Sequence, residues 1–283
     1  MKKIFCIAVT SLIVFAACGT TDSAPVYEPL DDFCPEAIAA SENLDEEEAP
    51  IADLALEDDP YYTDGPRMYS TLWVGTMNLL SSDVPRQFSD LALANDVFVR
   101  INLATQGWAT LYQLEEMLLE RLEGDRFFDY VVLAELPFRY LFETDEFMYD
   151  ALRLSEVVFE TGATPVFFTS PLNFGEGPYM WPAEYIPALT DHATEVFQNL
   201  AEQSGAIFID VSRAWVDTYT ENPELELFTP AGAKSRKGAY FTACILLAQL
   251  IDLQVTEMPE MNLYVYDGEF AQMLALEAWE IVN

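Results

Sequence analysis

Residues 96–136 read DVFVRINLATQGWATLYQLEEMLLERLEGDRFFDYVVLAEL, and this stretch decides the fold. A β-branched and aromatic run at 96–105 is followed by helical periodicity over 109–124, and an apolar run returns at 129–136. Apolar runs that are bounded by turn residues and separated by a helix predict strands of one parallel sheet. Such a sheet is covered by helices on both faces, so the stretch predicts an α/β protein.

The same alternation continues on both sides of this stretch. Strand-like runs lie at 69–75, 164–171 and 206–212, and helical runs lie at 84–95, about 145–161, 188–204 and 235–250. About five strands predict one three-layer αβα, flavodoxin-like domain over residues 65–283, without an internal repeat. Ligands of such folds bind beyond the carboxyl ends of the strands. The candidate loops are therefore 75–82, 105–110, 134–139, 170–185 and 228–237.

The first 18 residues have the features of a secretory signal. Lys2 and Lys3 precede an apolar run over 4–17 that is short for a bilayer span. The run ends in Phe-Ala-Ala-Cys, which resembles the bacterial lipobox, and this resemblance implies a diacylated Cys18 at the mature N-terminus. Gly19 then favours sorting to the outer membrane of a Gram-negative bacterium. The alternative is an ordinary cleaved signal with a chance cysteine.

Residues 19–64 are acidic, contain several prolines and have no Lys or Arg, which predicts a disordered, solvated tether. We interpret the acidic run 45–48 as a solvated charge run and not as a calcium loop. The whole chain has 13 Lys and Arg against 48 Asp and Glu, a formal net charge of −35. Removal of Lys2 and Lys3 makes the mature chain more acidic still. Nucleic acid partners are therefore not expected.

Cysteine and histidine are too few for a zinc site. After Cys6 leaves with the signal and Cys18 takes lipid, only Cys34 and Cys244 remain. An oxidising compartment permits a disulfide between them, but nothing in their spacing favours one. The single histidine, His192, lies off the apolar stripe of its helix, which predicts a solvated side chain. We expect neither a metal nor a cofactor.

The loops and strands together resemble the SGNH (GDSL-like) hydrolase family. VGTMNLLSSDVP at 74–85 is similar to the first motif, NLATQGWATL at 102–111 to the second, and YVVLAELP at 130–137 to the third-motif strand. Three later stretches are similar to further parts of the family. AIFIDVSRAW resembles the strand before the last motif, and SRKGAYFTACILLAQL resembles the helix after that motif. FAQMLALEAWEIV resembles the final helix. The resemblance covers about residues 68–283.

The resemblance also shows which catalytic residues this chain lacks. In that family a serine attacks an ester carbonyl and a histidine, three residues after an aspartate, takes its proton. Aligned on the motifs, the nucleophile position falls on Met77, the aspartate position on Pro230 and the histidine position on Ala233. Gly107 keeps the oxyanion-hole glycine, whereas the third-motif amide falls on Ala134, beside Glu135. We therefore expect a pseudoenzyme without the family's triad chemistry.

Other polar groups could take part in chemistry or ligand binding. Ser81, Ser82 and Asp83 favour helix capping over a displaced nucleophile. Glu135 at a strand end is expected to be partly buried with a raised pKa, and its carboxylate either accepts local backbone hydrogen bonds or contacts a ligand. The aromatic residues of loop 170–185 either bind the apolar face of a sugar or pack the loop onto the domain. They are Tyr179, Trp181 and Tyr185.

These observations predict a lipid-anchored envelope protein that binds a neutral or cationic ligand, such as an envelope glycan or a protein partner. The expected cleft residues are Thr76, Met77, Asn78, Gly107, Trp108, Glu135 and the loop 179–185. One alternative is an active esterase or carbohydrate deacetylase that uses Glu135 or Ser81. Another is a structural component of the envelope without a small ligand.

Overall fold

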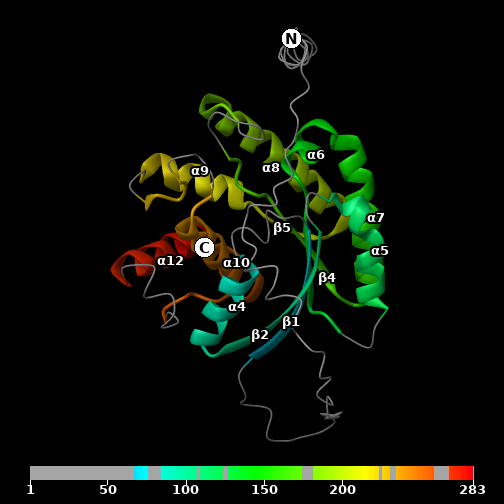
Figure 1. Ribbon diagram of the computed structural model, residues 1–283, viewed down its shortest axis with the longest axis horizontal. Helices are drawn as coiled ribbons and strands as arrows, with labels where there is room; N and C mark the ends of the chain where they lie inside the picture. The colour runs from blue at the N-terminus through cyan, green and yellow to red at the C-terminus, as the bar shows by residue number, and fades with distance from the viewer. Residues whose placement is uncertain are drawn as a thin grey trace, which may run out of the picture. The chain divides into compact units, whose positions relative to one another are not determined.

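The computed structural model describes residues 67–75, 84–106, 109–123, 127–173, 181–222, 225–229, 234–257 and 268–282. All of them belong to one compact unit, residues 60–283. The expected signal and tether, residues 1–64, lie outside the described residues, as do Cys18 and Cys34. The predicted α/β fold is confirmed: a parallel sheet lies between two layers of helices (Figure 1).

The sheet has five parallel strands in the order β2-β1-β3-β4-β5. They are β1 (Arg67–Gly75), β2 (Val97–Thr105), β3 (Tyr130–Ala134), β4 (Thr164–Phe168) and β5 (Ile207–Ile209). Gly75 at the end of β1 is in register with Thr105 of β2 and with Ala134 of β3. The carboxyl ends of these strands therefore form one edge of the sheet, which we call the carboxyl edge.

Side chains alternate between the two faces of the sheet, as the period of a strand requires. On β1, Trp73 packs into one hydrophobic cluster, whereas Leu72 and Val74 pack into the other. On β3, Val132 and Leu133 divide in the same way. Both faces of β3 and β4 are buried, which explains why these strands read as near-continuous apolar runs, whereas the edge strand β2 leaves Phe98, Arg100 and Leu103 exposed.

Two groups of helices cover these faces. The first is α4 (Val84–Ala94), α9 (Val211–Glu221), α10 (Arg236–Ile251) and α12 (Gly268–Val282), which surround the cluster that contains Trp73. The second is α5 (Leu111–Leu122), α6 (Pro137–Phe142), α7 (Thr144–Glu160) and α8 (Ile186–Ser204), which surround the other cluster. In Figure 1, α4, α10 and α12 lie to the left of the sheet and α5 and α7 to its right.

Two helices were not predicted from the sequence. Helix α6 begins at Pro137, inside the loop expected at 134–139, because proline fits the first turn of a helix. Helix α9 begins at Val211, inside the strand expected at 206–212. The Asp210 side chain accepts a hydrogen bond from the N–H of Arg213 and so caps α9, which ends β5 at Ile209.

Helix α10 is buried nearly all round and depends on a close contact at Gly238. A Cβ atom on Gly238 would lie 2.0 Å from Cη2 of Trp215 and 2.5 Å from the carbonyl oxygen of Leu227. Only glycine fits this position, which accounts for its place in the SRKGAY stretch. Cys244, on the same helix, is buried and free. Among the described residues, no helix combines the length and apolar character needed to cross a membrane.

Candidate functional site

Polar side chains from separate segments meet beyond the carboxyl edge. Glu135 follows β3, Ser170 follows β4 and Asp210 follows β5. Lys234 comes from the segment before α10, which is held by an antiparallel bridge between Phe228 and Lys234. Parallel strands bring their carboxyl ends together, so residues far apart in the sequence become neighbours here.

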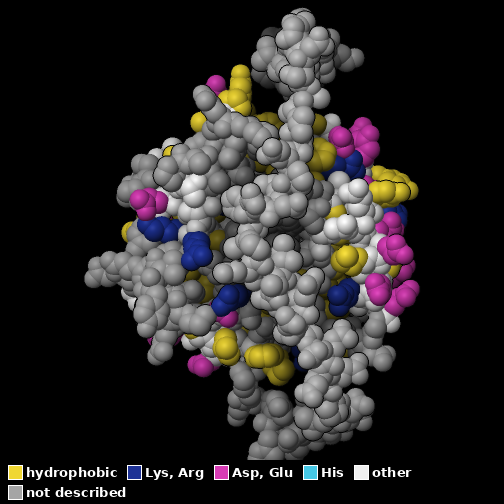
Figure 2. All heavy atoms as spheres, in the orientation of Figure 1, with side chains coloured by type: hydrophobic (Ala, Val, Ile, Leu, Met, Phe, Trp, Pro, Cys, Tyr) yellow, Lys and Arg dark blue, Asp and Glu magenta, His cyan; other side chains and the backbone are white. Residues whose placement is uncertain are grey.

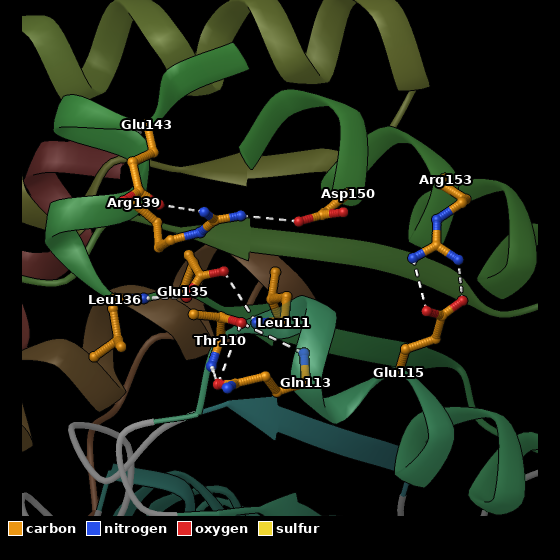
Figure 3. A network of polar contacts seen from close by, with 10 residues as sticks. All are labelled: Thr110, Leu111, Gln113, Glu115, Glu135, Leu136, Arg139, Glu143, Asp150 and Arg153. Carbon is orange, nitrogen blue, oxygen red and sulfur yellow. Dashed lines mark hydrogen bonds and ion pairs between the residues drawn. The ribbon is translucent and has the colours of Figure 1, made fainter. Parts of the chain in front are cut away.

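Glu135 is buried, with 4% of its surface exposed, and both carboxylate oxygens accept backbone hydrogen bonds. Oε2 accepts from the N–H of Leu111 at 3.0 Å, and Oε1 accepts from the N–H of Leu136 at 2.7 Å (Figure 3). Burial raises the pKa of Glu135 to about 7, although these hydrogen bonds and the nearby Arg139 act in the opposite direction. The raised pKa expected for Glu135 is confirmed, its burial is deeper than the partial burial expected, and only the hydrogen bond from Leu136 is local.

The same carboxylate helps to begin α5. Leu111 is the first residue of this helix, so its N–H has no partner within the helix. Thr110 completes the cap: its side chain accepts from the N–H of Gln113, and the Gln113 side chain accepts from the N–H of Thr110. Glu135 therefore links the end of β3 to the start of α5, and in its ionised form its charge lies at the favourable end of the helix dipole.

Arg139 lies above Glu135 and connects α6 to α7. Its guanidinium donates to Oδ2 of Asp150 at 3.0 Å and pairs with Glu143 one turn along the chain (Figure 3). The Asp150 side chain is nearly as buried as Glu135, and its charge raises the pKa of Glu135. Arg139 therefore offsets the negative charges of Asp150 and Glu135, two buried carboxylates whose unpaired charges would be costly.

Tyr140 is fully buried, and its hydroxyl lies among the groups of the carboxyl edge. Glu135, Asp210 and the backbone of Ser170 all influence its pKa, which burial raises well above its ordinary value. Within the described residues, the hydroxyl makes no hydrogen bond of normal geometry to a neighbouring side chain or carbonyl. The backbone of Ser170 is the polar neighbour that lowers its pKa, against the larger effect of burial.

Ser170 and Lys234 make a direct side-chain contact at this edge. Nζ of Lys234 donates to Oγ of Ser170 at 2.8 Å. Ser170 is 7% exposed, whereas Lys234 as a whole is half-buried and its ammonium end points inward. Burial lowers the pKa of Lys234 to about 8. This lysine therefore loses its proton far more readily than a surface lysine does.

The Asp210 carboxylate, in contrast, accepts hydrogen bonds from protein groups on both of its oxygens. Oδ1 accepts from Oγ1 of Thr169 at 3.0 Å and from the N–H of Arg213 at 3.1 Å, and Oδ2 accepts from Thr194. Thr169 in turn accepts from the N–H of Ser212 at 3.0 Å. This network joins β4, β5, α8 and α9, so we assign Asp210 to the scaffold of the site.

An aromatic surface follows β3 and β4. Phe142 at the end of α6 stacks on Trp181, with ring centroids 5.5 Å apart and planes tilted by 25°. Trp181 is half-buried against the core, and its backbone N–H donates to the carbonyl of Asn173 at 3.0 Å. Phe142, Phe138 and Tyr185 each leave 40% or more of their surface exposed. We call the stacked pair Phe142 and Trp181 the aromatic surface.

Most of the expected site residues lie outside the described residues. They are Thr76, Met77, Asn78, Ser81, Ser82, Asp83, Gly107, Trp108, Tyr179, Pro230 and Ala233. Of the others, Glu135 and Trp181 lie at the carboxyl edge, whereas His192 is exposed on α8 as expected. Among the described residues, His, Cys, Asp and Glu form no group of three that could hold a metal ion.

The fold is similar to that of SGNH hydrolases of known structure. A protein from Slackia heliotrinireducens described as an SGNH hydrolase matches with a TM-score of 0.52 at 19% identity, over 64% of this chain and 97% of that one. A DUF4886 family protein from Bacteroides uniformis matches with a TM-score of 0.56 at 12% identity, over 76% and 95% of the two chains.

The acetyl xylan esterase AlAXEase also matches, with a TM-score of 0.50 at 15% identity, over 64% of this chain and 100% of that one. At these identities the likeness establishes the fold. No protein-family model matches the sequence, and no curated protein matches it either.

Neither Ser170 nor Lys234 was predicted as a site residue, although both lie in the expected loops 170–185 and 228–237. One signal was present, because Lys234 directly follows Ala233, the residue at the family's histidine position. Their contact spans 64 residues of sequence, and only the packing of the segment before α10 against the end of β4 creates it.

Proposed function

We propose that this protein is an envelope lipoprotein with an SGNH-hydrolase fold that has lost the family's Ser-His-Asp chemistry and binds a neutral glycan at its carboxyl edge. The aromatic surface carries this proposal. Stacked and exposed rings beside a buried carboxylate suit the apolar faces of sugars and the hydroxyl groups at their rims. Helix α6 joins the two features, because it begins two residues after Glu135 and ends at Phe142.

Two further observations support a glycan over an anionic polymer. Figure 2 shows acidic side chains gathered along the margin formed by α5 and α7, with Lys and Arg side chains beside them. The formal net charge of −35 would repel a polyanion. In addition, one protein with a similar fold is named as an acetyl xylan esterase, an enzyme that acts on an acylated glycan.

Loss of the triad and attachment to the outer membrane are the parts of the proposal that rest on the sequence. Met77 carries no removable proton at the nucleophile position, and Pro230 and Ala233 supply neither acid nor base. The lipobox-like ending at Cys18 would place the domain in the envelope. Replacement of Cys18 by Ser should abolish palmitate incorporation and release the protein from membrane fractions.

Calorimetric titration of the full chain, purified in detergent, with neutral oligosaccharides such as xylohexaose tests glycan binding. We expect binding that is lost in Trp181→Ala and weakened up to about 10-fold in Phe142→Ala, since an aromatic contact contributes about 0.5–1.5 kcal/mol beyond the area that it buries. Phe127→Ala is the matched control, because this exposed ring lies before β3 at the opposite edge. No binding, or equal binding by all variants, would refute the proposal and favour a structural role.

An esterase with an unconventional site is the second candidate. The hydrogen bond between Ser170 and Lys234 favours it, at the edge where this fold carries its chemistry. In contrast, Glu135 has both oxygens engaged by backbone N–H groups, which makes it the weaker candidate for a nucleophile or base.

A further inference from the structure

We infer that Ser170 and Lys234 form a nucleophile–base pair that attacks acyl carbonyl groups, so that this protein hydrolyses esters without a histidine or an aspartate. The inference rests on the proposed function only in that the bound glycan would supply the ester. It differs from Ser-His-Asp chemistry in both its residues and their origin, because the serine follows β4 and the base is a lysine.

The position of the pair suits this role. Ser170 lies two residues beyond the end of β4, at the edge where ligands of this fold class bind. Lys234 reaches it from the segment that precedes α10, and their side chains meet at 2.8 Å. This distance is within the range over which a base removes a proton from a bound hydroxyl.

The environment of Lys234 supplies the required protonation state. Burial lowers its pKa to about 8, so a substantial fraction of the lysine is neutral at mildly alkaline pH. A neutral Nζ has a lone pair and accepts the Ser170 proton, whereas the ammonium form donates to Oγ. A surface lysine would stay charged at this pH and could only donate.

The other titratable groups around Ser170 come from three further elements. Tyr140 of α6 lies against the Ser170 backbone, and its hydroxyl is also close enough to Asp210 and Glu135 for their charges to raise its pKa. Asp210 and Glu135 are held by the hydrogen bonds described above. Lys234 is thus the group placed to exchange a proton with Ser170.

The reaction balances with these two residues and water. Oγ of Ser170 bonds to the carbonyl carbon of the ester while its proton moves to neutral Nζ of Lys234. The bond from that carbon to the leaving oxygen breaks, and the alkoxide takes the proton from the Lys234 ammonium. Water then attacks the acyl-serine and gives its proton to Lys234. Finally Ser170 leaves, recovers its proton from Lys234, and the carboxylic acid is released.

A fluorophosphonate probe tests the nucleophile directly, because a serine oxygen that displaces fluoride keeps the phosphonyl group. We expect the full chain in detergent to gain one adduct, which peptide mass spectrometry places on Ser170. Ser170→Ala should not react. Ser204→Ala, which changes a half-buried serine of α8 near the opposite edge, should react like the wild type. Circular dichroism and thermal melts confirm that each variant is folded.

Hydrolysis of p-nitrophenyl acetate tests the base. Lys234→Arg keeps a donor to Ser170 but cannot be deprotonated, so kcat/KM should fall at least about 100-fold. The wild-type rate should rise with pH and level off above about pH 8, and Lys234→Arg should lose this step. A purely structural lysine predicts no such rate step, and Lys234→Arg would then leave the rate unchanged.

The outcomes separate this inference from the proposed function. A folded wild type that neither reacts with the probe nor hydrolyses the ester above the Ser170→Ala background would overturn the inference, whether or not a glycan binds. An adduct on Ser170 with no glycan binding would overturn glycan recognition and leave the pair in place. Labelling at another serine would also overturn the inference.

Discussion

Replacement of Glu135 by Gln should change how the stability of the protein depends on pH. Glu135 is 4% exposed, and burial raises its pKa from 4.5 to about 7. The folded protein therefore holds this proton up to about pH 7, whereas the unfolded chain releases it near pH 4.5. The resulting stabilisation is complete below pH 4.5 and is lost as the pH rises through 7.

The size of the effect follows from the two pKa values. Between pH 5 and pH 8 the wild type should lose about 2.5 kcal/mol of unfolding free energy through this group, since each pKa unit corresponds to about 1.36 kcal/mol. The amide of the Glu135→Gln variant does not titrate. The substitution also removes one acceptor for the N–H of Leu111 or Leu136, but this cost of about 1–3 kcal/mol does not change with pH.

Urea denaturation at pH 5, 6, 7 and 8 measures the difference. The unfolding free energy of Glu135→Gln relative to wild type should rise by about 2–3 kcal/mol from the lowest to the highest pH. Glu202→Gln, at an exposed site on α8, serves as the control. Parallel pH profiles for wild type and Glu135→Gln would refute the reasoning, because they would mean that Glu135 titrates alike in the folded and unfolded chains.

Three further predictions concern the scaffold around the site. Gly238→Ala should lower the unfolding free energy by about 1–3 kcal/mol or prevent folding, because the new methyl group would overlap Trp215 and the Leu227 carbonyl; thermal melts measure this. Thr110→Ala should cost about 1 kcal/mol through loss of the α5 cap, and Thr110→Ser should restore most of it in the same assay. Cys244 is buried with its pKa raised to about 12, so a disulfide reagent should modify it only after denaturation; rapid modification in the native protein, detected by peptide mapping, would contradict this.

The alternation of strands and helices was predictable because it depends on local patterns. Helix α4 begins at Val84 as expected and ends at Ala94, one residue before the predicted limit. The start of α9 was missed because the apolar residues at 206–211 read as one strand, whereas Asp210 uses its carboxylate as a cap. Helix α6 was missed because its 6 residues give too short a period to detect.

At the site, the burial of Glu135 followed from its place at a strand end, but its two hydrogen-bond partners could not be chosen from the sequence. One of them, Leu111, belongs to a helix 24 residues away. The stacking of Phe142 on Trp181 and the contact between Ser170 and Lys234 are likewise long-range, so no local pattern reports them.

The sequence by itself determined the α/β class, the order of the five strands along the chain and the edge where polar groups gather, because hydrophobic period and turn chemistry act over a few residues. The tertiary structure alone decided which of those polar groups meet. Parallel strands β3 and β4 bring their following loops together, and the close approach at Gly238, four residues beyond Lys234, fixes the first turn of α10. Side-chain contact and burial, and with them the raised pKa of Glu135 and the lowered pKa of Lys234, exist only once these segments pack.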